Sequence, residues 1–129
     1  MAEASIQAAG PDGQFESRIE AIRKRFATKF AARMQQTVAD LSRMSGEGAA
    51  PADTVANAYH WLHEICGIAS TIGFTSTGLS ARSCDSLLVG PYRAQRGLSA
   101  AELAQLTEGL ESLRLTAQVE LQIQDSHRG

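Results

Sequence analysis

The chain is organised around residues 59–74, which read YHWLHEICGIASTIGF. This stretch holds two of the three histidines, the only tryptophan and one of the two cysteines. Its apolar residues recur at spacings of three and four, which is typical of an amphipathic helix. Gly67 is unexpected there, because a glycine inside a helix costs about 1 kcal/mol relative to alanine. We expect Gly67 to be needed because something large must come close to His63.

Length and composition predict a single domain in a chain of 129 residues. Hydrophobic residues make up 43% of the chain and aromatic residues 5%, so the expected core is mainly aliphatic. The net charge of −2 argues against a non-specific nucleic-acid binder, for which a strongly basic balance is expected. No apolar run is long enough to span a membrane, and residues 1–13 lack the features of a secretory signal. These features predict a cytoplasmic protein.

The first expected helix covers residues 14–44. Its apolar positions recur at helical spacing and are Phe15, Ile19, Ile22, Phe26, Phe30, Met34, Val38 and Leu41. Its other faces carry basic residues, namely Arg18, Arg23, Lys24, Arg25, Lys29 and Arg33. This basic run has two interpretations, a solvated helix face or a docking surface for an acidic partner.

Three further helices are expected. The second is capped by Asp53 or Thr54 and ends near residues 71–73. The third is capped by Thr75 or Ser76 and runs through Leu88, before a loop over residues 90–97. The fourth opens with a capping box, a serine at 99 followed by a glutamate at 102, and runs to about residue 123. Its apolar stripe is Leu98, Leu103, Leu106, Leu110, Leu113, Ala117 and Leu121.

No segment alternates apolar and polar residues as a half-buried strand does. Four long amphipathic helices joined by short loops are typical of an antiparallel four-helix bundle. We therefore predict an all-α fold in which residues 14–129 form the bundle and residues 1–13 form a flexible tail.

On a helical wheel, the second helix separates its two histidines. The core side is formed by Val55, Ala58, Tyr59, Leu62, Ile65, Ala69 and Ile72. His60 lies opposite this side, whereas His63 lies at its border, on the same strip as Gly67 and Ser70. The imidazole of His63 is thus expected to stand above a flat patch of small residues. A neutral imidazole is a competent nucleophile near pH 7 and accepts a phosphoryl group at one ring nitrogen.

Residues 63–74 resemble the signature of histidine-containing phosphotransfer (HPt) domains. That pattern reads histidine, any residue, apolar, usually lysine, glycine, any residue, small, two variable residues, apolar, glycine. The matching positions are His63, Ile65, Gly67, Ala69, Ile72 and Gly73. Leu79, Cys84 and Leu87 resemble the next helix of the family, and outside residues 59–88 the resemblance is one of helical pattern alone.

The resemblance implies that His63 accepts and donates a phosphoryl group in a two-component phosphorelay. The expected partners are response-regulator receiver domains and a histidine kinase or hybrid kinase, without nucleic acid or membrane. No cofactor is expected on this chain, because Mg²⁺ belongs to the receiver. The chain has no nucleotide-binding signature. It is therefore expected to be a phosphoryl carrier without ATP-dependent kinase activity of its own, rather than an enzyme.

The expected docking positions around His63 are Gly67, Ser70, Cys66, His60 and Glu64. Cys66 departs from the family pattern, since cysteine cannot supply the charge of the usual lysine. Arg82 on the third helix is a candidate replacement.

The sequence offers four alternatives to these expectations. With His60 as the acceptor, the next turn would present Glu64, whose carboxylate would repel a phosphoryl group. A metal site at His60, His63 and Cys66 lacks a fourth ligand, so no metal is expected. Cys66 and Cys84 are expected to pack between helices rather than form a disulfide. A different class of function is a non-catalytic helical adaptor that binds receivers or kinases through the same face.

Overall fold

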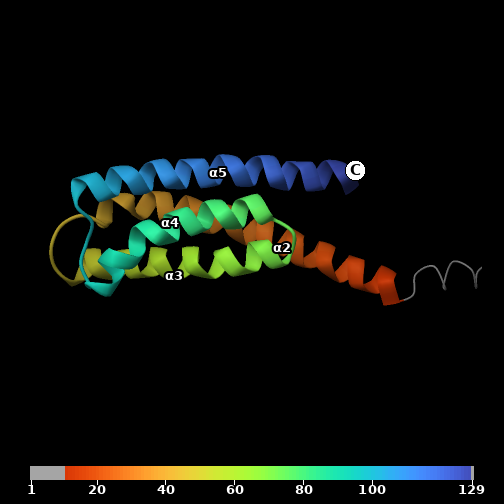
Figure 1. The fold of residues 1–129 in the computed structure, drawn as a ribbon, viewed down its shortest axis with the longest axis horizontal. Helices are drawn as coiled ribbons and strands as arrows, with labels where there is room; N and C mark the ends of the chain where they lie inside the picture. Colours follow the sequence, from red (N-terminus) through yellow and green to blue (C-terminus); the bar gives the residue numbers. More distant parts are fainter. Residues whose placement is uncertain (1–10, 129) are drawn as a thin grey trace, which may run out of the picture.

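The computed structural model describes residues 11–128, and the side chains of residues 13–121. Four long helices form it: α2 (Pro11–Asp40), α3 (Ala49–Thr71), α4 (Thr75–Arg93) and α5 (Ala100–Arg128). A short 3₁₀ helix, η1 (Leu41–Arg43), follows α2. Successive helices run in opposite directions (Figure 1), and residues 11–128 contain no strand. The predicted all-α four-helix bundle is therefore confirmed.

The core lies between the facing sides of the four helices. Its largest fully buried side chains include Phe74, Met44, Leu62, Leu88, Leu106, Leu110 and Leu113. An aromatic group joins α2 to the α3–α4 pair, with ring centroids 5.5 Å apart for Phe26 and Phe74 and 5.8 Å apart for Phe30 and Trp61. Trp61 is only 7% exposed and packs against α2.

Helices α3 and α4 form the closest pair in the bundle. The turn between them depends on Gly73, whose φ of 98° lies in the left-handed region that glycine tolerates. The Phe74 N–H donates to the Ala69 carbonyl at 2.7 Å, and the Arg23 Nε donates to the Ile72 carbonyl at 2.7 Å. The free carbonyls at the end of α3 are thereby satisfied, and α4 is turned back along α3.

A glycine on α4 sets how closely the two helices approach. A Cβ added at Gly78 would lie 2.5 Å from the Ser70 Oγ and 3.3 Å from the Cys66 carbonyl oxygen. A larger residue at this position would require the Ser70 hydroxyl to move and the adjoining backbone to give way slightly. Gly78 therefore allows the two helices to approach closely at the level of Ser70.

The predicted start of α3 was wrong. The helix begins at Ala49 after Gly48, with Pro51 in its first turn, where a missing N–H costs nothing. Thr54 is inside the helix and donates its hydroxyl to the Ala50 carbonyl at 2.9 Å. The predicted cap at Asp53 or Thr54 is thus replaced by a glycine without a side-chain cap.

The predicted cap of α4 and its predicted C-terminal end were also wrong, although the helix begins at Thr75. At the start, the carboxylate of Glu120 on α5 accepts from the N–H groups of Ser76 at 3.1 Å and Thr77 at 2.8 Å. The cap is therefore supplied by another helix rather than by Thr75 or Ser76. At the other end α4 continues to Arg93, and Pro91, expected in a loop, lies in its last turn.

The capping box of α5 is confirmed in both directions. The Ser99 N–H donates to Glu102 at 2.8 Å, and the Glu102 N–H donates to the Ser99 Oγ at 3.1 Å. Arg96 adds two bonds to the same carboxylate, at 2.7 and 2.9 Å. The guanidinium hydrogen bond, followed by the Ser99 N–H, lowers the pKa of Glu102 to about 2.

The predicted apolar stripe of α2 is only partly buried. Phe26, Phe30 and Met34 are in the core, whereas Phe15, Ile22 and Val38 are 64%, 40% and 46% exposed. The first turns of α2 extend past the α3–α4 turn (Figure 1), so α3 and α4 do not cover them, whereas Ile22 lies further along and lines a groove between α2 and α3. Residues 11–13, predicted to be tail, are helical, and residues 1–10 lie outside the described part of the chain.

Candidate functional site around His63

His63 lies in the middle of α3 with 66% of its side chain exposed. One turn later, a Cβ added at Gly67 would meet nothing within 4 Å. The packing of this chain therefore does not account for the glycine, in contrast to Gly78. The imidazole is open to an approaching molecule on the side where Gly67 lies.

Asp85 on α4 lies beside the imidazole. Its Oδ1 is 3.5 Å from the His63 Nδ1, and the carboxylate side chain is 19% exposed. This Oδ1 is buried without a hydrogen-bond partner among the described residues. Asp85 was not predicted as a site residue, because its place opposite His63 follows from the register of α4 against α3, which the sequence does not specify.

The Tyr59 ring adjoins His63, and the rings of Tyr92 and His60 in turn adjoin Tyr59. The Tyr59 ring stacks on His63, with centroids 5.5 Å apart and planes 22° apart, and on Tyr92, with centroids 4.2 Å apart. His60 meets the edge of Tyr92 at 5.1 Å. Tyr59 was placed in the core by the sequence, but it is only half-buried and supports one face of the imidazole.

Cys66, one turn after His63, is 9% exposed, so it presents little surface to a partner. Burial raises the pKa of its thiol, as does the charge of Asp85, whereas the charge of Arg82 lowers it. Cys84 on α4 is fully buried, and burial, together with Cys66, raises its pKa to about 11. Both cysteines are free thiols. Because the thiolate is the reactive form, this burial makes them unreactive packing groups.

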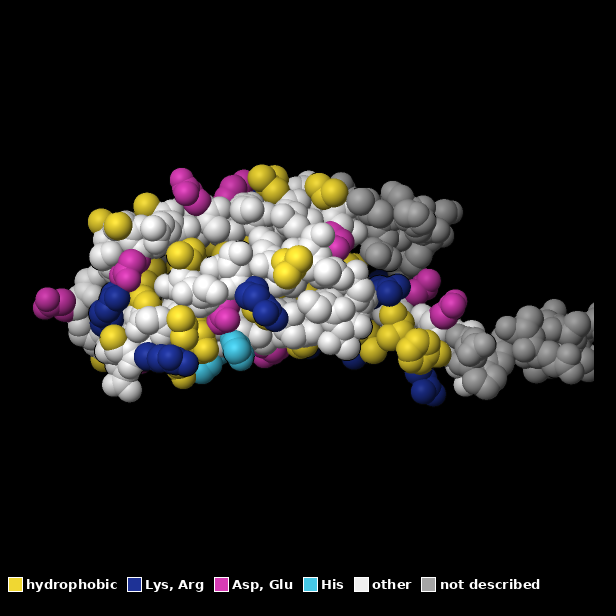
Figure 2. All heavy atoms as spheres, viewed as in Figure 1, with side chains coloured by type: hydrophobic (Ala, Val, Ile, Leu, Met, Phe, Trp, Pro, Cys, Tyr) yellow, Lys and Arg dark blue, Asp and Glu magenta, His cyan; other side chains and the backbone are white. Residues whose placement is uncertain are grey.

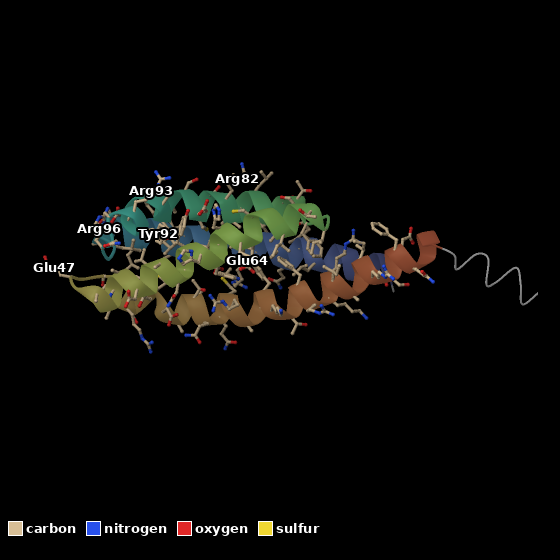
Figure 3. The ribbon with its side chains drawn as sticks, turned by 90° about the horizontal axis from the view of Figure 1, so that it is seen from below. Glu47, Glu64, Arg82, Tyr92, Arg93 and Arg96 are labelled. Atoms are coloured by element: carbon tan, nitrogen blue, oxygen red, sulfur yellow. The ribbon has the colours of Figure 1, made fainter. Side chains whose placement is uncertain are left out.

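Arg82 lies level with Cys66 on the opposite helix. His63 comes three positions before Cys66 on α3, and Arg82 comes three positions before Asp85 on α4, which runs antiparallel to α3. Because Asp85 lies beside His63, Arg82 lies near Cys66. Arg82 is exposed and projects from the outer side of α4, as does Arg93 further along (Figure 3). Figure 2 shows dark-blue and magenta side chains of α4 next to the cyan histidines. A positive charge is thus present at the level of Cys66, but on α4.

The expected docking residues divide between two sides of α3. Ser70 lies next to Gly78 of α4, and its hydroxyl donates to the Cys66 carbonyl of its own helix at 3.2 Å. His60 and Glu64 instead line a groove between α2 and α3 (Figure 3 labels Glu64). Gly67 is exposed. The five residues therefore surround His63 without forming one continuous patch.

The groove between α2 and α3 has a volume of about 790 Å³. Its apolar lining includes Phe26, Phe30, Trp61, Ile65 and Ile68, and its basic lining is Arg25, Lys29 and Arg33. Arg33 lies over the Trp61 ring at 5.9 Å. Part of the basic run of α2 therefore borders a concave apolar surface rather than a uniformly solvated face.

Among the described residues, no three His, Cys, Asp or Glu side chains come together as metal ligands would. Within the same part of the chain, no helix is long and apolar enough to cross a membrane. Comparison with family models, curated proteins and solved structures finds no match to this chain.

Proposed function

We propose that this chain is a histidine phosphotransfer protein that relays a phosphoryl group between receiver domains, or from a histidine kinase to a receiver, through His63. The observation that carries the proposal is the open space at Gly67 beside an exposed histidine. A helix interior tolerates glycine at a cost of about 1 kcal/mol. Packing within the described chain does not require a glycine at position 67, and Gly67, unlike the equally open Gly90, lies one turn from an exposed histidine, so we attribute it to clearance for a partner.

In this mechanism the His63 Nε2 attacks the phosphorus of an aspartyl phosphate on a receiver. The N–P bond forms, and the P–O bond breaks with its electron pair returning to the aspartate. Attack by a second receiver reverses these steps and frees the imidazole. The receiver contributes its own Mg²⁺ and acidic residues, so this chain contributes a nucleophile, a scaffold and a docking surface.

The test is transfer from a phosphorylated receiver domain, with a panel of receivers as donors. We expect acid-labile, base-stable label on the parent protein and on His60→Gln, and none on His63→Gln. His60→Gln is a matched control, because it removes the neighbouring exposed imidazole of the same helix. Label that survives His63→Gln would show that the site assignment is wrong.

The basic and apolar groove between α2 and α3 favours a second candidate, a helical adaptor that binds an acidic partner without phosphotransfer. Charge complementarity would steer such a partner to Arg25 and Lys29. Receivers that bind the protein but leave no label on it would favour the adaptor. In that case binding would be weakened by Lys29→Glu and unchanged by His63→Gln.

A further inference from the structure

One edge of α2 carries a row of exposed basic and apolar residues, which we call the basic stripe. The row starts on the first turns of α2, which extend past the α3–α4 turn (Figure 1), and continues along the groove between α2 and α3. Its spacings of three and four keep its members on one side of the helix. The members are Phe15, Arg18, Ile22, Arg25, Lys29 and Arg33, all of them exposed.

The outer face of α5 carries a second exposed row, which we call the acidic stripe. Leu115 and Val119 in this row are 49% and 58% exposed, and they lie on the side of α5 opposite its buried residues. The full row is Glu108, Glu111, Leu115 and Val119. Figure 2 shows magenta side chains along α5 followed by yellow ones towards its C-terminal end. This face of α5 is therefore apolar and acidic, and no described helix covers it.

The charges of the two stripes are opposite. Residues 14–33 contain six cations and two anions, whereas residues 100–121 contain four anions and one cation. Among the described residues, neither the four cations of the basic stripe nor Glu108 is in an ion pair. Glu111 shares its charge with Arg114 of its own helix. Most of these charges are thus available to a partner.

The order of residues along the two stripes also matches. Beyond Ile22 on α2, the next two cations of the basic stripe follow after about 4.5 and 10.5 Å, at the helical rise of about 1.5 Å per residue. Backwards from Leu115 on α5, the two acids of the acidic stripe follow after about 6 and 10.5 Å. Two such helices laid antiparallel would place apolar residues against apolar residues and acids against cations at the same time.

The groove gives the basic stripe an apolar floor. Phe26, Phe30 and Trp61 line the groove and are each less than a tenth exposed. A helix that presents a narrow apolar ridge can reach such a floor, as in helix-in-groove recognition. Glu64 and Asp40 also line the groove, and they leave the four cations of the stripe with an excess of positive charge. An acidic ridge therefore fits the groove.

We propose that the acidic stripe of α5 docks into the groove and along the basic stripe of a second copy of this chain. The groove borders α3, which lies at the opposite edge of the bundle from α5 (Figure 1), so a copy cannot fill its own groove. The contact joins two different surfaces, and such heterologous contacts continue from copy to copy unless they close into a ring. Neither stripe includes His63, so this inference does not depend on the proposed function.

The first test measures the mass of the protein by analytical ultracentrifugation over a range of concentrations. We expect monomers at about 10 µM and species larger than a dimer at about 1 mM, as for a small transient interface. Sodium chloride at about 1 M should weaken the association, because it reduces the screening length to about 3 Å. A protein that is still monomeric at about 1 mM would overturn the proposal and assign the groove to a different acidic partner.

A mixture of two variants tests the heterologous contact itself. Arg25→Glu with Lys29→Glu disables the basic stripe, and Leu115→Gln with Val119→Gln disables the acidic stripe. All four residues are exposed, so both variants should unfold at the temperature of the parent. Each variant alone should be monomeric, whereas an equal mixture should form a dimer that grows no further, because it holds one intact stripe of each kind. Association of either variant alone, or a mixture that stays monomeric, would overturn the proposal.

Two exposed positions outside the stripes provide matched controls. Lys24→Glu changes the charge of α2 on the opposite face of that helix, and Leu79→Gln removes an exposed apolar side chain from α4. Both variants should associate as the parent does, and a loss of association in either would contradict the assignment to the two stripes. His63→Gln should also associate normally, so a failure of this proposal and a failure of the proposed function are distinguishable.

Discussion

Two glycines inside helices of this protein have different physical reasons. Gly78 is required by packing, because a Cβ there would lie 2.5 Å from the Ser70 Oγ. Gly67 has open space around it, so packing within the described chain does not require a glycine there. The unusual glycine was visible in the sequence, but only the structure shows whether a helical glycine is needed for packing.

Substitution of Gly67 tests the proposed clearance for a partner. Gly67→Gln should slow phosphotransfer from a receiver by about tenfold to a hundredfold, because a displaced partner loses the alignment of the reacting atoms. The helix should become more stable by up to about 1 kcal/mol, since glycine is replaced by a better helix former.

Gly90→Gln is the control for Gly67→Gln, because Gly90 also lies in a helix with nothing within 4 Å of its added Cβ. Transfer rates and thermal unfolding would be measured for both variants. An unchanged transfer rate in Gly67→Gln would contradict the clearance account.

Arg82 is the second test at the residue scale. With Cys66 unable to carry charge, Arg82 is the cation at its level, and we expect Arg82→Ala to slow transfer by about three- to tenfold. Arg93→Ala is the matched control on the same exposed side of α4 (Figure 3). Equal rates in the two variants, measured at low ionic strength, would argue against a role for Arg82.

At the scale of elements, helix ends were predicted where the cap is local and missed where it is not. The Ser99–Glu102 capping box is contained in four consecutive residues, and it forms as predicted. The cap of α4 comes from Glu120, more than forty residues away in the chain. The residues near Thr75 give no indication of this distant contact. The hydroxyl of Thr75 or Ser76 was therefore predicted to be the cap instead.

Removal of the Glu120 carboxylate should destabilise the fold. Glu120→Ala leaves the Ser76 and Thr77 N–H groups and the buried Thr77 hydroxyl without an acceptor, which should lower the free energy of unfolding by about 1–2 kcal/mol. Urea unfolding measures the change, with the exposed Glu108→Ala as control. Equal stability of the two variants would be inconsistent with this cap.

The capping box of α5 predicts a pH dependence of stability. The pKa of Glu102 is lowered from 4.5 to about 2, first by the Arg96 hydrogen bond and then by the Ser99 N–H. The contribution of Glu102 to the free energy of unfolding is therefore fully present above pH 4.5 and is lost as the pH falls towards 2. Between these values Tm should fall more steeply for the parent than for Glu102→Gln. Parallel pH profiles would show that Glu102 makes no such contribution.

At the scale of the whole molecule, the helical periods and loops were sufficient to predict an antiparallel bundle. The helical spacing of apolar residues does not show how far each helix extends beyond its neighbours. Phe15 and Ile22 were therefore predicted to be in the core, but both are exposed. They also do not fix the register of α3 against α4. His63 was therefore identifiable as a candidate, whereas Asp85 and the position of Arg82 required the folded structure.

The bundle has one function in this account, which is to hold the imidazole of His63 exposed, oriented and accessible. The most direct test incubates the protein with a phosphorylated receiver domain and locates the phosphorus by ³¹P NMR correlation to the imidazole ring protons. We predict that phosphorus leaves the receiver and appears on Nε2 of His63. Phosphorus bound to His60, or to no histidine while the receiver binds the protein, would contradict the account.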